Sequence, residues 1–407
     1  MAKERMFDRG RFVFIGEPVF GRDNVVTTAK LNSKSEWSRT RLNFGVKVGN
    51  NTQFLNTEYI HSDKIKTVKL FDKEGNGFEV KLDDTANPMH LDKVGDFSKI
   101  TVNLETDKEV KKQYYSLLFR RRNHEIKADK TTEDEDKIKE YTEQLKEFSS
   151  NVVQFVHIKD FIKFINSNQE VIKGNKIKVT GDVKSNYYNG KNRLQFIPSS
   201  VEFAPEDSKE ELTVHLDIFF DRDSIDDDKK EKKMYINGYI GERIKKADKL
   251  IPTQIIFDYS KANLEDENQN NLVEFVKGFF NVKNKKVLHR LPVICQVING
   301  AEVVEFDESH LTKTQKTAIA LGLNTLEDFK PKGNVFGDRI NFIRLLQPDL
   351  KVATDGAIES IDVEDLYNYL LEDDSDKSIE DVKNNDNEES KKEEQSNDDL
   401  MKALFGV

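Results

Sequence analysis

The fold of this chain is predicted mainly from residues Lys173–Phe203, which read KGNKIKVTGDVKSNYYNGKNRLQFIPSSVEF. Apolar and polar positions alternate with a period of two, which predicts two strands, each with one buried face. The apolar phase holds Ile177, Val179, Val183, Leu194 and Phe196. Gly181 interrupts the first strand where a barrel strand must bend or bulge. The aromatic loop Tyr187–Gly190 then joins the strands into a hairpin.

The same alternation occurs upstream, in RTRLNFGVKV at residues 39–48. Its apolar phase, Leu42 to Val48, predicts a strand whose other face is polar and basic. A second alternating run follows near Gln53–Ile60. TVKLFDKEGNGFEVKL predicts a hairpin around the turn Gly75–Gly77. Residues 1–35 mix charge with Gly and Thr and are expected to form an irregular arm.

Two segments between these strands have the pattern of helices. Residues 128–150 are strongly charged with few apolar positions, which predicts an exposed insertion that could be helical. Ile158–Ile165 carries Phe161, Ile162 and Ile165 at helical spacing and predicts an amphipathic helix.

The second half of the chain repeats this order weakly. Strands are predicted near Leu212–Phe220, Lys233–Ile240, Ile255–Tyr259 and in VLHRLPVICQVINGAEVVEF (287–306), with a helix in NNLVEFVKGFF (270–280). Both halves contain Val-Glu-Phe after a strand, which makes a duplication plausible. Residues 311–342 are interpreted as a helix followed by a loop. IDVEDLYNYLL (361–371) is interpreted as a helix whose apolar face carries Val363, Leu366, Tyr367 and Leu370.

Charge is distributed unevenly along the chain, whose formal net charge is -10. Residues 1–200 hold 36 Lys and Arg against 29 Asp and Glu, residues 201–371 hold 23 against 32, and residues 372–407 hold 5 against 13. A basic front half and an acidic end are typical of a nucleic-acid-binding protein with a separate protein-docking tail. Ordinary variation of surface charge is the alternative.

Several classes of chemistry find no support in the sequence. The chain has no apolar run of membrane-spanning length, no apolar signal segment near its N-terminus and one cysteine, Cys295, so a cytoplasmic location is expected. No metal-binding or phosphate-binding motif is present, and we predict no cofactor, no metal and no enzymatic activity. Asp226–Asp228 could imitate the carboxylates of a nuclease, but a solvated loop is the simpler interpretation.

The segment Lys173–Phe203 resembles the second half of the OB fold in single-stranded-DNA-binding proteins: a helix, a strand with a central glycine, an aromatic hairpin carrying Gly-Lys, and a strand. The strand at residues 39–48 resembles that fold's first strand. The resemblance spans roughly residues 37–205 and implies a β-barrel that binds single-stranded DNA. The long form and the Lys- and Asn-rich composition suggest a replication protein of a phage.

A single strand is bound by aromatic groups that stack on bases and by cations that contact phosphates. The predicted nucleic-acid-binding residues are Trp37, Arg39, Arg41, Lys47, Arg120, Arg121, Arg122, Lys178, Lys184, Tyr187, Tyr188, Lys191 and Arg193. Alternatives stay open for some of them. Trp37 and the two tyrosines could pack onto the barrel, and the three arginines could solvate a loop.

The C-terminal tail gives a second indication of function. Its acidic stretch is too polar to fold alone and ends in DDLMKALFGV. It resembles, loosely, the acidic tail with which bacterial single-stranded-DNA-binding proteins recruit replication and repair enzymes. The predicted partner-binding residues are Asp398, Asp399, Leu400, Leu404 and Phe405. A solubilising tail is the alternative.

These observations predict a mainly β protein with α insertions, built from tandem OB-like barrels and a disordered acidic tail. The expected divisions are an arm (1–36), an OB-like DNA-binding domain (37–205), a second OB-like or α+β domain (211–371) and the tail (372–407). The predicted function is to bind and protect single-stranded DNA during replication or recombination and to recruit partner proteins, with possible self-association. An RNA- or tRNA-binding OB protein and a structural virion protein are the alternatives.

Overall fold

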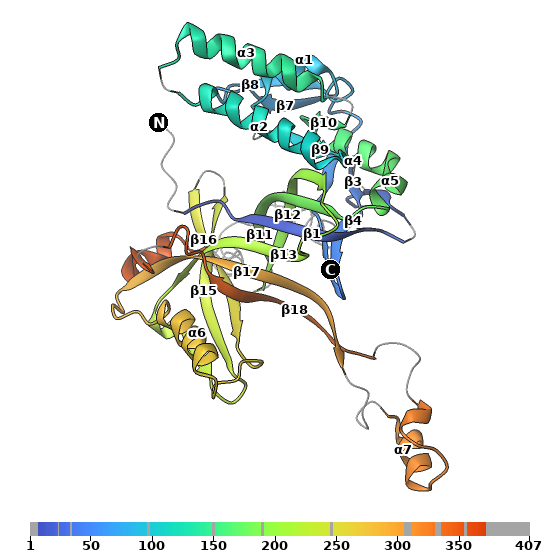
Figure 1. The fold of residues 1–407 in the computed structure, drawn as a ribbon, viewed down its shortest axis with the longest axis vertical. Helices are drawn as coiled ribbons and strands as arrows, with labels where there is room; N and C mark the ends of the chain where they lie inside the picture. Colours follow the sequence, from blue (N-terminus) through green and yellow to red (C-terminus); the bar gives the residue numbers. More distant parts are fainter. Residues whose placement is uncertain are drawn as a thin grey trace, which may run out of the picture.

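A computed structural model describes residues 7–371, apart from residues 23, 33–34, 96–97, 128, 149–150, 189–190, 245–246, 305–310, 330–334 and 354–355. The predicted tail, residues 372–407, lies outside the described residues. The protein is mainly β with helical insertions, as predicted (Figure 1).

The strands of the first half are β1 (Arg11–Phe20), β2 (Val26–Lys30), β3 (Trp37–Leu42), β4 (Phe44–Val48), β5 (Asn51–Phe54), β6 (Glu58–Ser62), β7 (Thr67–Phe71), β8 (Gly77–Lys81), β9 (Ile100–Asn103), β10 (Val152–Phe155), β11 (Ile177–Tyr188) and β12 (Lys191–Phe203). Its helices are α1 (Pro88–Lys93), α2 (Lys108–Glu125), α3 (Thr132–Lys146), α4 (Ile158–Ser167) and α5 (Gln169–Lys173).

The strands of the second half are β13 (Glu211–Phe220), β14 (Ile225–Asp228), β15 (Lys233–Ile244), β16 (Ala247–Asp258), β17 (Val287–Val304), β18 (Val335–Pro348) and β19 (Ile358–Asp362). Its helices are α6 (Glu267–Gly278) and α7 (Lys313–Ala320), with short 3-10 helices at Arg222–Ser224, Glu327–Phe329 and Val363–Asn368.

The second half contains a closed five-stranded barrel, named barrel 2 here. Strand β13 pairs with β15, β15 with β16, β16 with β18, β18 with β17, and β17 again with β13. The β16–β18 pair is parallel and the others are antiparallel. With α6 between the third and fourth strands, this is the strand order of the OB fold. Figure 1 shows α6 against the barrel and the β17–β18 hairpin extending away from it toward α7.

The first half repeats this order as a looser ring, named barrel 1. Its second and third strands are the hairpin formed by β3–β4 and β5–β6, and its fourth and fifth strands are β11 and β12. Strand β1 pairs with both β4 and β11. The third strand reaches β12 through a backbone hydrogen bond of 2.7 Å, donated by the Asn56 N–H to the Phe196 carbonyl. The expectation of tandem OB-like barrels is therefore confirmed.

The two barrels are joined through their first strands, because β1 and β13 pair antiparallel with Phe12 opposite Val214. Phe12 and Val214 each lie opposite a register shift in their own barrel. Phe12 pairs with Gly181, where the register of β11 and β12 shifts, and Val214 pairs with Cys295, where the register of β17 and β18 shifts. The predicted bulge at Gly181 is thus confirmed and has a counterpart in barrel 2.

The sequence prediction for the first barrel strand was wrong. The segment expected to be an irregular arm contains β1, which lies between β11 and β13 in the largest sheet. Residues 39–48 belong to the second strand, divided into β3 and β4 at Asn43. The predicted buried phase is correct, since Leu42, Phe44 and Val46 are all fully buried.

Two predictions in the second half were also wrong. The expected loop after α7 contains β18, the strand that closes barrel 2. Residues 361–371 form the end of β19 and a 3-10 helix, and Tyr367 is 83% exposed rather than part of an apolar face. The two Val-Glu-Phe sequences do not correspond, because the first lies in the fifth strand of barrel 1 and the second begins at the end of the fourth strand of barrel 2.

The other predicted helices and the predicted hairpin around Gly75–Gly77 are confirmed. Helix α4 buries Phe161, Ile162 and Ile165 against the main core. The charged insertion forms α3, which begins with a capping box between Thr131 and Asp134 and packs against α2. Strands β7 and β8 flank the predicted glycine turn. These helices and this hairpin lie together at the top of Figure 1, beyond the barrel strands.

Candidate nucleic-acid interface

The second strand of barrel 1 presents its odd-numbered residues outward and buries Thr40, Leu42, Phe44 and Val46. Trp37, Arg39, Arg41 and Lys47 therefore share one face, with neighbouring outward side chains about 6.6 Å apart along the strand. The third strand adds Phe54 and Ile60, which are 43% and 44% exposed, opposite Gly45 and Arg39. We call these six residues the outer face of barrel 1.

Two cations of this face have no ion-pair partner among the described residues. Within the described part of the chain, neither Arg41 nor Lys47 forms an ion pair, although Glu58 lies opposite Arg41 in the register. The Arg41 Nε is buried and lacks a hydrogen-bond partner. Trp37 is 38% exposed. The face thus combines an accessible indole, an exposed phenyl ring and uncompensated cations, the combination that binds stacked bases and phosphates.

The residues predicted on the β11–β12 hairpin lie elsewhere. This hairpin docks on barrel 2, where the Ser185 N–H donates to Glu242 Oε2 (2.9 Å) and Asn192 Nδ2 donates to Thr253 Oγ1 (2.7 Å). Lys184 and Arg193 are exposed there, and Tyr187 is partly buried against the main core. The side chains of Tyr188 and Lys191 lie outside the described set.

The remaining predicted cations form a third group near α2. Lys178 is paired with Glu202 at 3.0 Å, and Glu202 also accepts a hydrogen bond of 2.7 Å from the Tyr115 hydroxyl. Arg120, Arg121 and Arg122 lie on α2 rather than in a loop. Successive helical residues point about 100° apart, and Arg121 is paired with Glu125. The three arginines therefore do not form one cationic point, and the structure distributes the predicted residues over three places.

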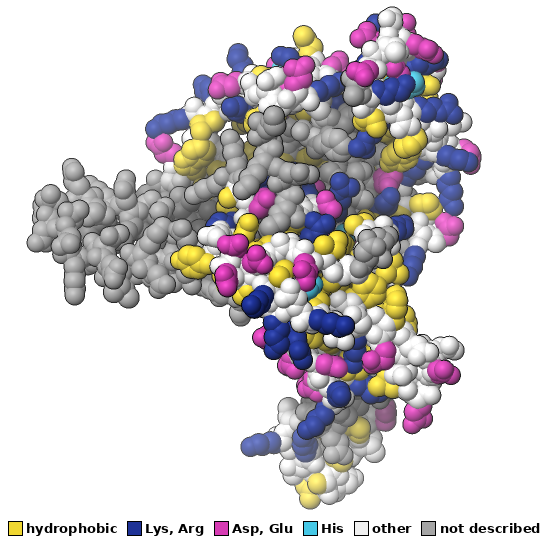
Figure 2. All heavy atoms as spheres, turned by 90° about the vertical axis from the view of Figure 1, so that its left-hand side faces the viewer, with side chains coloured by type: hydrophobic (Ala, Val, Ile, Leu, Met, Phe, Trp, Pro, Cys, Tyr) yellow, Lys and Arg dark blue, Asp and Glu magenta, His cyan; other side chains and the backbone are white. Residues whose placement is uncertain are grey.

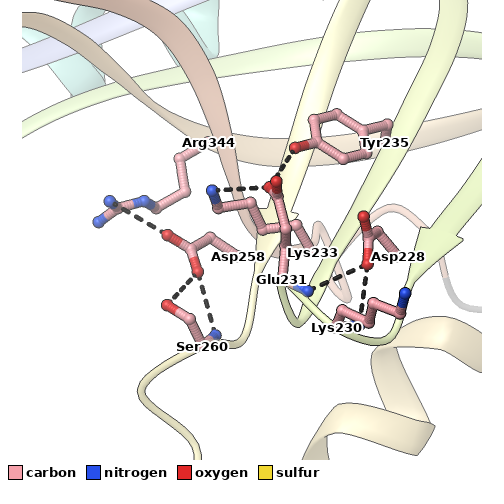
Figure 3. Close-up of polar contacts among 8 residues, drawn as sticks. All are labelled: Asp228, Lys230, Glu231, Lys233, Tyr235, Asp258, Ser260 and Arg344. Carbon is pink, nitrogen blue, oxygen red and sulfur yellow. Dashed lines mark hydrogen bonds and ion pairs between the residues drawn. The ribbon is translucent and has the colours of Figure 1, made fainter.

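Barrel 2 has a corresponding outer face on β15, β16 and β18, which the sequence did not indicate. Tyr235, Ile256 and Arg344 form one row across the three strands, and the Arg344 guanidinium lies 5.7 Å from the centre of the Phe342 ring. Figure 3 shows that carboxylates form hydrogen bonds and ion pairs with the polar groups of this face. Glu231 Oε2 accepts from the Tyr235 hydroxyl (2.9 Å) and pairs with Lys233 Nζ (3.2 Å).

The second cation of this face is also paired. Arg344 Nη2 lies 3.7 Å from Asp258 Oδ2. The hydrogen bond from Tyr235 and the nearby Lys233 lower the pKa of Glu231. Burial opposes ionisation of Asp258, but hydrogen bonds from Ser260 and the charge of Arg344 outweigh it and lower that pKa as well. Both carboxyls are therefore ionised at neutral pH and neutralise the cations beside them.

The barrels dock on each other reciprocally. The Ser185 N–H of β11 donates to Glu242 of barrel 2, and the Asn299 N–H of β17 donates to Asn51 Oδ1 of barrel 1 (2.9 Å). Ser185 lies four residues after Gly181, and Asn299 lies four residues after Cys295. Each fourth-strand hairpin thus crosses to the second and third strands of the other barrel.

The face of the molecule drawn in Figure 2 carries Lys and Arg side chains interspersed with Asp and Glu. Phe54 and Ile60 were missed as site residues, although they belong to the alternating run near Gln53–Ile60. Phe342 was missed because its segment was interpreted as a loop, and Arg344 because no strand was predicted after residue 342. Alternation in FGDRINFIRLLQP could have indicated that strand.

Within the described ranges, no group of three or more His, Cys, Asp or Glu side chains could hold a metal ion. No helix there is both long and apolar enough to cross a bilayer. No protein-family model matches the sequence, and no curated protein matches it. Among solved structures, the chain is similar to a deletion mutant of the single-stranded DNA binding protein from Thermus aquaticus, with 9% identity, a TM-score of 0.27, and coverage of 72% of this chain and 87% of that one. A likeness at this TM-score supports no conclusion about what this chain binds.

Proposed function

We propose that this protein binds single-stranded DNA, without strong sequence preference, on the outer face of barrel 1. The observation that carries the proposal is the row of Trp37, Arg39, Arg41 and Lys47 on one side of one strand, beside the exposed Phe54. A stacked base gains about 1–3 kcal/mol from an aromatic side chain whatever its identity. Arg41 and Lys47, which form no ion pair with any described residue, gain most from a phosphate, since no such pair has to be broken.

Two further parts of the proposal concern the role of the protein in the cell. We infer a role in replication or recombination, in which the protein protects the strand and recruits partners through the tail residues Asp398, Asp399, Leu400, Leu404 and Phe405. An apolar knob flanked by carboxylates suits a partner pocket with a basic rim. These residues lie outside the described part of the chain, so the support for this step is the sequence alone.

Fluorescence titration tests DNA binding directly, because Trp37 is the only tryptophan. We expect oligo-dT to quench its emission and higher salt to weaken the affinity. A labelled oligonucleotide followed by anisotropy gives an independent reading. Competition with an RNA of matching sequence distinguishes DNA from RNA binding. No binding of oligo-dT at low salt would exclude the proposal and favour a structural role.

A further inference from the structure

A cavity of about 420 Å³ lies at the junction of the two barrels. Its walls come from the residues just before β1, from β11 and β12 of barrel 1, and from β15 of barrel 2. Its volume falls within the range of about 300–1,000 Å³ that is typical of small-ligand pockets. At the opposite junction, Asn51 fastens β5 to β17 through hydrogen bonds to Val297 and Asn299.

Two of the three cations that line the cavity are paired with carboxylates, and the third is not. Arg9, Lys184 and Arg243 line it together with the carboxylates Asp182 and Glu242. Arg9 pairs with Asp182 at 2.6 Å, and Arg243 pairs with Asp248 at 3.7 Å. Glu242 accepts backbone hydrogen bonds from Ser185 and Arg243. Among the residues that the structure describes, Lys184 has no ion-pair partner. An anionic group entering the cavity would therefore meet at least one uncompensated cation.

The rest of the lining is apolar, with Phe7, Val183 and Ile197 beside two glycines. Phe7 and Val183 are buried, and Ile197 projects outward from β12 next to the buried Phe196. A ligand that suits this cavity has a flat apolar part and an anionic part, which is the chemistry of a nucleotide.

The third strand of barrel 1 lies next to Ile197, one of the residues that line the cavity. The Asn56 N–H bonds the carbonyl of Phe196, so the outward residues of the third strand border Ile197. Phe54 and Asn56 are outward neighbours on that strand. A strand lying on the outer face of barrel 1 and continuing past Phe54 would reach Ile197 and then the cavity.

We propose that the cavity binds one nucleotide unit of the bound single strand, with a phosphate toward Lys184 and the base against Ile197. The strand would pass there from barrel 1 toward barrel 2. This inference rests on the proposed function and adds to it a second contact, which only a strand long enough to leave the outer face of barrel 1 can use.

The test compares oligo-dT of about 8 nucleotides, which one OB barrel can hold, with oligo-dT of about 30 nucleotides, using the full chain. Ile197→Trp fills the cavity without a change of charge, and Lys184→Glu reverses its free cation. We expect each variant to bind the long oligonucleotide about tenfold more weakly and to bind the short one as the wild type does. Lys112→Glu, on the exposed surface of α2, is the control for an equal change of charge.

A second measurement does not depend on either variant folding well. A photoreactive thymine placed at successive positions of the long oligonucleotide should cross-link to the peptide containing Lys184 or Ile197 in the wild-type protein. If the wild type binds the long oligonucleotide but neither variant weakens it and no such cross-link forms, the cavity proposal is wrong and the proposed function stands. If the wild type binds neither oligonucleotide, both proposals are wrong.

Discussion

The outer faces of the two barrels share the second and third strands of the fold, with the fifth strand added on barrel 2, and their charges are arranged differently. On barrel 1, Arg41 and Lys47 make no ion pair with any described residue. On barrel 2, Glu231 and Asp258 hold Lys233 and Arg344. Both faces carry aromatic rings. Two faces of similar residue composition therefore differ in whether their cations are paired, and we expect this difference to decide which of them binds phosphate.

The largest expected effect comes from reversing the cations of barrel 1. Arg41→Glu combined with Lys47→Glu removes two favourable phosphate contacts and adds two repulsive ones, and we expect oligo-dT affinity at low salt to fall about a hundredfold. Lys233→Glu combined with Arg344→Glu makes the same change on barrel 2 and should reduce affinity far less. Anisotropy titrations of both variants at two salt concentrations measure the difference. Equal losses of affinity in both double variants would contradict the expected difference between the two faces.

The equivalent bulges at Gly181 and Cys295 differ in how much space they leave for a side chain. A Cβ at Gly181 would lie 2.0 Å from the Ile197 carbonyl oxygen, whereas barrel 2 holds the buried Cys295 at the corresponding position. We expect Gly181→Ala to lower the free energy of unfolding by about 2 kcal/mol, because backbone has to move. Cys295→Ala should cost less. Thermal or denaturant unfolding checks this, and a Gly181→Ala variant as stable as the wild type would contradict the geometry.

Removing one aromatic ring should have an intermediate effect. Phe54→Ala deletes an exposed ring that contributes little to the core, so we expect unchanged stability and about tenfold weaker binding of oligo-dT. Phe342→Ala removes the ring beside Arg344 on barrel 2 and should change DNA affinity less than twofold. Parallel titrations with melting curves separate lost stacking from lost folding.

The smallest expected effect is an increase in DNA affinity rather than a loss. Glu231→Gln combined with Asp258→Asn frees Lys233 and Arg344, and we expect oligo-dT to bind about threefold more tightly. Acid should not reproduce this gain near neutral pH, because the pKa of each carboxyl lies below its ordinary value. The pairs are therefore lost only as pH falls through those lowered pKa values. A gain already present at pH 6 would show that other groups control the face.

Sequence alone determined the buried phase of most strands, the β7–β8 and β11–β12 hairpins, helix α4 and the basic character of the first half. Alternation suffices there because one face of each strand is buried and the other is polar. It failed for β1, whose outward positions Val13 and Ile15 are also apolar, since this strand is paired on both edges in the middle of the sheet. It failed again for β18, which lies in the segment interpreted as a loop after α7.

Only the tertiary structure decided which predicted cations act together. The outward phase of one strand is readable from its sequence, so Trp37, Arg39, Arg41 and Lys47 could be grouped in advance. The crossing of the β11–β12 hairpin to barrel 2, the helical position of Arg120–Arg122 and the pairing of Arg344 with Asp258 depend on contacts between residues far apart in the chain. Such contacts arise from strand register and packing, which local patterns do not specify.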